Sequence, residues 1–441
     1  MDADGAPGLV HDALVPRSLL PDLTPLRTSP DYRRLWTGFT LSNVGAQMAV
    51  VAVGLQVYDV TGSTASVGLV GLFALVPLVA FGLYGGALAD HLDRRTLGLA
   101  ASLLTVATSV VAAGQAWLGN TSVWVLYAIV AVWSAGFAVA SPARTSIYPR
   151  ILPLEQLPAA NALSVFAMNT ALTAGPLLAG GFVDHGGFRS AYTVDAVLTL
   201  AAVYSLWRLP AVPPEREPGE EVARRVGVRS VLDGFAFLRT APNVRMTFVA
   251  DIVAMLLAQP RVLFPAAGAV ILGGGASTVG MLYAATAVGG IGAMVLSGRL
   301  GGVHRQGLAI LVSVAGWGVG VVGLGVALLG SGGWLTPRQA LLGALLAMAV
   351  AGAADAVSAV FRTTILQSAA PDRMRGRLQG VFVVVVAGGP RLGELAGGGV
   401  AEWLGEGWTA VVGGLACVAA VLVLAVRQRG FVRYDARHPT P

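Results

Sequence analysis

The sequence contains no lysine, one cysteine and few charged residues of any kind. Asp, Glu, Lys and Arg make up 12% of its 441 residues, whereas soluble domains average about 25%. Apolar residues account for 55%, and the mean hydropathy is +0.72. This balance excludes a soluble globular domain and predicts an all-α membrane protein that crosses the bilayer several times.

The missing residue types also exclude several kinds of chemistry. Without lysine there is no phosphate-binding G-x-x-x-x-G-K-[ST] loop, which disfavours an ATP-driven protein. The single Cys417 cannot form an intramolecular disulfide and is expected to be a packing residue. No His, Cys and Asp spacing suggests a metal site, and no nucleophile has an obvious base. We therefore predict no metal, no cofactor and no enzyme activity.

Apolar runs long enough to span a bilayer recur throughout the chain. They predict twelve transmembrane helices in two six-helix bundles, residues 30–209 and 242–427. A cytoplasmic tail (1–29), a linker with an interfacial helix (210–241) and a second cytoplasmic tail (428–441) complete the chain. The twelve spans are expected at 33–58, 64–89, 95–118, 122–145, 159–183, 189–208, 245–272, 276–299, 306–329, 338–362, 377–402 and 407–426.

The distribution of arginine sets the expected orientation. All 29 basic residues are arginine, and only Arg189 and Arg338 fall in loops on one side of the predicted membrane. Because arginine-rich loops stay in the cytoplasm, both termini are predicted to be cytoplasmic. The net charge of +6 is thereby explained without a nucleic-acid partner.

The two bundles repeat each other in sequence. Leu26 to Arg33 recurs as Leu238 to Arg245 at an offset of 212, and Arg144-Thr145 recurs as Arg362-Thr363 at an offset of 218. Gly175-Pro176 answers Gly389-Pro390. A parallel six-plus-six repeat is typical of secondary transporters that bind substrate near the midplane between the halves.

The segment between spans 2 and 3, Gly85 to Arg95, concentrates charge in what is predicted to be a short hairpin loop. Its pattern G-x-L-A-D-x-x-x-R-R resembles a loop motif of the major facilitator superfamily. The resemblance implies a conformational lock in which Asp90 meets the N-terminus of span 11. Gly86, Arg94 and Arg95 complete the motif. A charged loop that only sets topology is the alternative.

Span 5 contains a second motif of this kind. Gly175-Pro176-Leu177-Leu178-Ala179-Gly180 resembles the antiporter motif G-P-x-x-G-G, with Ala179 in place of a glycine. The resemblance implies tight helix packing at Gly175 and Gly180 and a bend at Pro176. Ordinary small-residue packing is the alternative.

Two intramembrane acids are candidates for proton coupling. The repeat offsets place Asp251 of span 7 opposite Phe39 of span 1, and Asp355 of span 10 opposite Phe137 of span 4. The superfamily resemblance implies that these four spans line the cavity. A carboxylate that loses and regains water as access alternates can bind and release a proton. Alternatively, each Asp bonds a neighbouring helix. The two aromatic residues are expected to contact a ring-bearing substrate.

Further polar residues in the spans are assigned to the substrate cavity. Asn43 and Gln47, with Gln259 at the repeat position of Gln47, offer neutral hydrogen bonds to a ligand or to another helix. Arg391 and Glu394 have the i, i+3 spacing of an intrahelical ion pair. Arg391 is otherwise a cavity residue, and Glu394 is a third candidate for proton coupling.

Arg261 lies between Pro260 and Pro265 in span 7. Two prolines so close together should break the helix and free backbone carbonyl groups. Irregular backbone at this depth is expected at a cavity or gate, where Arg261 would contact the substrate.

A closer resemblance covers most of residues 30–427. Arg261 to Ala266, Ser230 to Leu238 and Gly85 to Arg95 are similar to the bacterial enterobactin exporter branch. This resemblance implies a monomeric proton-coupled antiporter in a bacterial cell membrane, with no partner beyond substrate, protons and lipid. The predicted substrate is a siderophore or a similar amphipathic secondary metabolite. A multidrug or macrolide efflux pump of the same fold is the alternative, and a channel would not need a two-half repeat with asymmetric acids.

Overall fold

The computed structural model describes residues 22–91, 93–145, 147–212, 228–295, 300, 302–438 and 440, and nearly all of them are helical. In the first half the elements are α1 (Thr24–Thr28), α2 (Pro30–Thr61), α3 (Thr64–His91), α4 (Arg94–Trp117), α5 (Val123–Thr145), α6 (Tyr148–Ile151), η1 (Leu154–Gln156) and α7 (Leu157–Trp207). In the second half they are α8 (Val228–Thr240), α9 (Pro242–Leu257), η2 (Arg261–Leu263), α10 (Phe264–Ala266), η3 (Ala267–Ile271), α11 (Gly275–Val295), α12 (Gln306–Gly330), α13 (Pro337–Ala369), α14 (Asp372–Arg427) and α15 (Arg429–Val432).

Ten helical segments within the described residues are long and apolar enough to cross a membrane. Two of them run through α7 and α14, which contain 51 and 56 residues and are interrupted by Gly187 (φ 69°) and Gly405 (φ 75°). At about 1.5 Å per residue each of these helices is more than twice the roughly 30 Å hydrocarbon thickness. Each therefore has two arms, separated where the sequence predicts a turn between spans. The all-α membrane class is confirmed, and the number of twelve spans stays a prediction.

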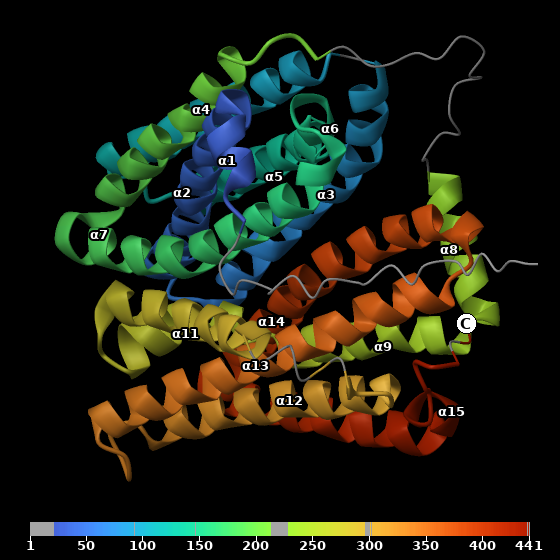
Figure 1. Ribbon diagram of the computed structural model, residues 1–441. Helices are drawn as coiled ribbons and strands as arrows, with labels where there is room; N and C mark the ends of the chain where they lie inside the picture. Colours follow the sequence, from blue (N-terminus) through green and yellow to red (C-terminus); the bar gives the residue numbers. More distant parts are fainter. Residues whose placement is uncertain are drawn as a thin grey trace, which may run out of the picture.

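The helices form two groups, α1–α7 and α8–α15, which lie one above the other in Figure 1. The groups meet where α7 packs against α11 and where α3 packs against α14. Buried apolar residues of both groups, such as Met48 and Val244, belong to one continuous core. The short helix predicted before span 7 is present as α8, with Leu238 buried and Phe235 exposed.

The two ends of the bundle differ in backbone conformation. We call the end that carries α1, α8 and α15 the linker face, and the opposite end the hairpin face. All seven glycines with positive φ among the described residues lie in turns of the hairpin face. They are Gly62, Gly119, Gly187, Gly273, Gly275, Gly332 and Gly405. Left-handed backbone lets these turns reverse the chain tightly.

Helix packing corrects one register of the sequence repeat. A Cβ added to Gly175 would lie 2.6 Å from Gln47 Cβ, and one added to Gly393 would lie 2.9 Å from Gln259 Cβ. Gln47 and Gln259 occupy the same repeat position, so Gly175 corresponds to Gly393 at an offset of 218. The predicted match with Gly389 is wrong by one helical turn. A four-residue slip leaves small residues on the same helix face, so the sequence match alone did not reveal it.

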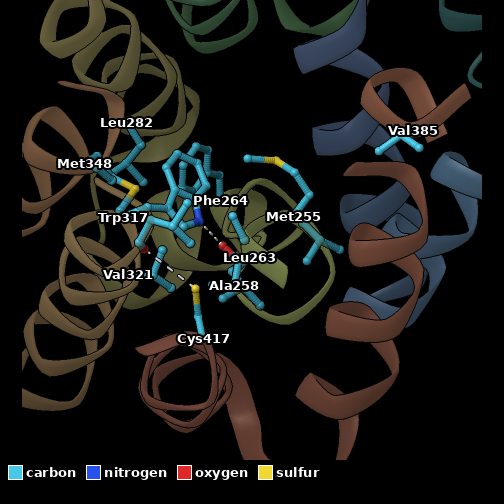
Figure 2. Packing of buried hydrophobic residues seen from close by; sticks show 14 of the residues in the cluster. Met255, Ala258, Leu263, Phe264, Leu282, Trp317, Val321, Met348, Val385 and Cys417 are labelled. Carbon is cyan, nitrogen blue, oxygen red and sulfur yellow. Dashed lines mark hydrogen bonds between the residues drawn. The ribbon is translucent and has the colours of Figure 1, made fainter. Parts of the chain in front are cut away.

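The predicted break in span 7 is present. Helix α9 ends at Leu257, and the backbone angles of Ala258 are no longer helical. The chain resumes as a short 3-10 turn at Arg261. The freed Ala258 carbonyl accepts a hydrogen bond of 2.9 Å from Nε1 of the buried Trp317 on α12. Figure 2 shows this bond inside the apolar core beside Phe264. A neighbouring helix thus satisfies the carbonyl that the prolines released.

Replacing Trp317 with Phe should lower the stability of the second half. The carbonyl of Ala258 would remain buried without its donor, which costs about 1–3 kcal/mol. Thermal unfolding in detergent, followed by circular dichroism, should show a melting temperature lower by several degrees. Trp334→Phe is the matched control because Trp334 is 67% exposed on the hairpin face. Equal melting temperatures for Trp317→Phe and the wild type would contradict this role.

Candidate functional site

An arginine joins the two acids predicted to couple protons. Arg362 of α13 forms an ion pair with Asp251 of α9 through Nη1, and its Nη2 lies 3.2 Å from Asp355 Oδ1. The Arg362 and Asp251 side chains are 11% and 6% exposed, whereas that of Asp355 is 40% exposed. The site is therefore a carboxylate–guanidinium–carboxylate triad with one accessible carboxylate.

Arg362 was used in the sequence analysis only as a marker of the repeat. It follows Asp355 by seven residues, which is close to two helical turns and places both on one face of α13. That spacing was the available signal for their contact. The contact with Asp251 lies between two helices and had no counterpart in local spacing.

The first half contains the repeat counterpart of this triad without its acids. The guanidinium of Arg144, at the position equivalent to Arg362, lies 5.0 Å from the ring centroid of Phe39, at the position of Asp251. A cation over an aromatic ring is an attractive contact. The same backbone positions thus hold a cation–π pair in one half and an ion pair in the other.

The arginine–aromatic pair borders a small cavity. Residues from α2, α4, α5 and α7 enclose about 110 Å³, and a second space of about 30 Å³ lies on another side of Phe39. The equivalent space beside Asp251 and Arg362 measures only about 10 Å³. The larger cavity is of the order of one aromatic ring, since an apolar cavity of about 150 Å³ accommodates benzene. Its walls include Phe39, Ser42, Asn43, Ser102, Thr105, Trp133, Phe137, Arg144 and Thr199.

Other predicted cavity residues lie at helix contacts. Gln47 packs against Gly175, and Gln259 packs against Gly393 and is 6% exposed. Both glutamines therefore lie against a glycine of another helix, and the choice between hydrogen bonds to a ligand and hydrogen bonds to a helix stays open. Arg261 is exposed at the start of η2, beside the break in span 7.

The expected ion pair in span 11 is present. Arg391 Nη1 lies 3.1 Å from Glu394 Oε2, and the two side chains are 31% and 12% exposed. The pair faces α3, because a Cβ added to Gly71 would lie 3.0 Å from Glu394 Oε2. Arg391 and Glu394 therefore sit at a contact between the two halves.

The charged motif after span 2 occupies a shorter turn than predicted. Helix α3 continues to His91, so Gly86 and Asp90 belong to its last turns and not to a loop. The structure describes the backbone of these two residues but not their side chains. The predicted lock at Asp90 therefore stays a prediction. Arg95 donates from Nε to Leu206 O (3.1 Å) and from Nη2 to Trp207 O (2.8 Å).

These contacts place the arginines of the motif within the first half. Arg95 satisfies carbonyls at the C-terminus of α7, where a cation also opposes the helix dipole. The Arg94 backbone N–H donates to Val212 O at 3.1 Å. Arg95 thus fastens the end of α7 to the start of α4, and Arg94 fastens the chain beyond α7 to it.

The antiporter-like motif packs span 5 against two other helices. Gly175 lies against α2, and Gly180 lies against α11, where a Cβ would be 2.6 Å from Ala276 O. Gly280 of α11 in turn approaches Pro176 O closely. The motif therefore lies at the junction of the two halves, in accord with the tight packing that its small residues predict.

The sequence analysis missed acids that bond across this junction and one buried acid. Asp184 of α7 accepts hydrogen bonds from backbone N–H groups of α11, and Glu402 of α14 accepts one from α3. Asp195 of α7 is 1% exposed and lies beside Gly45. The uncorrected repeat register had concealed that Asp184 and Glu402 are equivalent.

Comparisons with known proteins agree with this architecture. Residues 21–436 match the family described as transmembrane secretion effector. The enterobactin exporter EntS of Citrobacter koseri is 28% identical over 429 residues, which cover 96% of this chain and 98% of that protein. The EntS protein of Escherichia coli O1:K1 is 28% identical over 411 residues, or 93% of this chain and 94% of that protein.

Solved transporter structures share the fold at low sequence identity. The nucleoside transporter NupG has a TM-score of 0.69 at 14% identity, and the match covers 92% of this chain and all of the NupG chain. A D-xylose–proton symporter has a TM-score of 0.68 at 15% identity, covering 89% of this chain and 96% of its own. This protein is a transporter and not an enzyme: the chain belongs to the transmembrane secretion effector family of the major facilitator superfamily.

Proposed function

We propose that this transporter is a proton-coupled exporter of a siderophore or a similar amphipathic secondary metabolite, working by alternating access. Both termini and the linker face lie in the cytoplasm in this proposal, in accord with the arginine distribution. The relatives named enterobactin exporter EntS support the direction of transport and the substrate class. The proposed transporter acts as a monomer.

The arginine–aromatic cavity of the first half carries the substrate proposal. A catechol group combines an aromatic ring with acidic hydroxyl oxygens, and Arg144 together with Phe39, Trp133 and Phe137 complements both parts. The cavity of about 110 Å³ holds one ring and not a whole siderophore. The remainder of the ligand would lie between the halves, beside Asp355 and Arg261.

Transport in everted membrane vesicles tests the substrate class. Vesicles with an acidic interior should accumulate enterobactin, and a protonophore should abolish the accumulation. Vesicles without the protein, and a parallel panel of macrolides, are the controls. Macrolide accumulation without enterobactin accumulation would replace the siderophore proposal with the multidrug alternative.

The triad supplies a physical reason for proton coupling. Two carboxylates and one guanidinium carry a net charge of −1, which is costly to enclose in a medium of low dielectric constant. One proton makes the triad neutral, and Asp355 is its accessible member. Closure around the triad would therefore favour proton binding, and reopening to water would favour release. Glu394 is a weaker candidate because Arg391 neutralises it within α14.

Replacing Phe39 or Phe137 with Leu should weaken substrate binding. Each ring contact is worth about 1 kcal/mol, which corresponds to a dissociation constant about fivefold higher. Titration of purified protein with enterobactin in detergent, followed by tryptophan fluorescence, measures the change. Phe81→Leu is the control, since Phe81 is exposed and lies outside this cavity. Unchanged affinity in both cavity variants would remove these rings from the substrate site.

Replacing Asp251 or Asp355 with Asn should uncouple transport from the proton gradient. Either change removes one negative charge and leaves the triad neutral without a bound proton, so no proton is needed for closure. Gradient-driven accumulation should be lost, while downhill exchange of substrate continues. Asp59→Asn is the control because Asp59 is exposed at the end of α2. Full gradient-driven transport in both variants would exclude the triad and leave Glu394 for testing.

A further inference from the structure

We propose that Asp184 and Glu402 are positioning residues that hold the hairpin face closed, each by capping a helix of the opposite half. This inference concerns the access states of the exporter proposed above and therefore rests on that function. Asp184 ends the first arm of α7, and its Oδ1 and Oδ2 each accept a hydrogen bond of 2.8 Å from Ala276 N and Ser277 N, respectively. These groups belong to the first turn of α11, in the other half.

Glu402 repeats this arrangement in the opposite sense. It lies near the end of the first arm of α14, and its Oε1 accepts from Ala65 N (3.2 Å) and from the Ser63 hydroxyl. Both donors are at the start of α3, in the first half. Glu406 adds a hydrogen bond of 2.6 Å from the Thr64 hydroxyl. The carboxylates meet helix N-termini, where unpaired N–H groups and the helix dipole favour an anion.

The corrected repeat register makes the two caps equivalent. Asp184 and Glu402 are related by the offset of 218, and the helix starts that they cap are related by the offset of 212. The glycines below them obey the same relation. A Cβ on Gly180 would lie 2.6 Å from Ala276 O, and one on Gly398 would lie 2.7 Å from Thr64 O. Both junctions therefore combine close backbone packing with a carboxylate cap.

This pair of junctions must separate before a ligand can leave through the hairpin face. Separation breaks the hydrogen bonds between the two carboxylates and the N–H groups of α3 and α11. The caps therefore stabilise the closed arrangement. The predicted lock at Asp90 would act at the linker face and stabilise the opposite arrangement. Closure at each face would then depend on acids that cap helices of the other half.

Distances between spin labels test the lock without requiring transport. In a Cys417→Ala background, Leu118→Cys and Trp334→Cys place one label on each half at the hairpin face, where these residues are 88% and 67% exposed. Leu154→Cys and Thr240→Cys form a second pair at the linker face. Double electron–electron resonance in lipid nanodiscs gives the distance distribution of each pair.

Asp184→Ala and Glu402→Ala should each raise the ratio of hairpin-open to hairpin-closed protein about fivefold. Because the caps are separate, the double variant should raise this ratio about 25-fold. The linker-face pair should shorten as the hairpin-face pair lengthens. General destabilisation would broaden both distributions without this opposite movement.

Two further variants distinguish loss of the cap from general destabilisation of the fold. Asp184→Asn keeps one acceptor oxygen and should lie between the wild type and Asp184→Ala, while Asp59→Ala should leave both distributions unchanged. Unchanged distances in the double alanine variant would overturn the lock even if the wild type exports enterobactin. Failure of enterobactin export with the predicted shift in distances would instead overturn only the proposed substrate.

Discussion

The close backbone approach between helices of opposite halves is the contact on which the rest of the structure depends. Helix α7 meets α11 at Gly180, and α14 meets α3 at Gly398, at distances that leave no room for a side chain. In lipid there is little hydrophobic gain from bringing helices together, so such packing and the polar bonds beside it supply much of the association.

The two halves have the same framework but different charges at equivalent positions. Arg144 stacks on Phe39 in the first half, and Arg362 pairs with Asp251 and Asp355 in the second. The first half therefore offers a cation beside aromatic surface, while the second pairs its arginine with two acids. In the proposed cycle, substrate recognition and proton binding are divided between two versions of one structural unit.

The break in α9 shows how an irregular backbone is tolerated at membrane depth. Pro260 and Pro265 interrupt the helix, and the indole of Trp317 satisfies the carbonyl of Ala258 from α12. The break therefore belongs to the packed core of the second half. Arg261 lies beside the break and is exposed. The direction of its side chain is therefore set by the break, and it would differ in an unbroken helix.

Much of the framework was determined by the sequence alone. Apolar run length predicted the spans, and the recurring segments predicted two related halves. The proline pair predicted the break after Leu257, and the i, i+3 spacing predicted the Arg391–Glu394 pair. These features depend on composition or on neighbours along one helix, where geometry follows directly from residue spacing.

Only the tertiary structure decided which residues meet between helices. The contact of Arg362 with Asp251, the register that pairs Gly175 with Gly393, and the caps at Asp184 and Glu402 all depend on helix rotation and axial offset. A slip of one helical turn preserves the apolar pattern of a span, yet it exchanges every partner on the neighbouring helix. The sequence identified Asp251 and Asp355 as candidates, whereas the packing of the helices assigned their partners and revealed the caps.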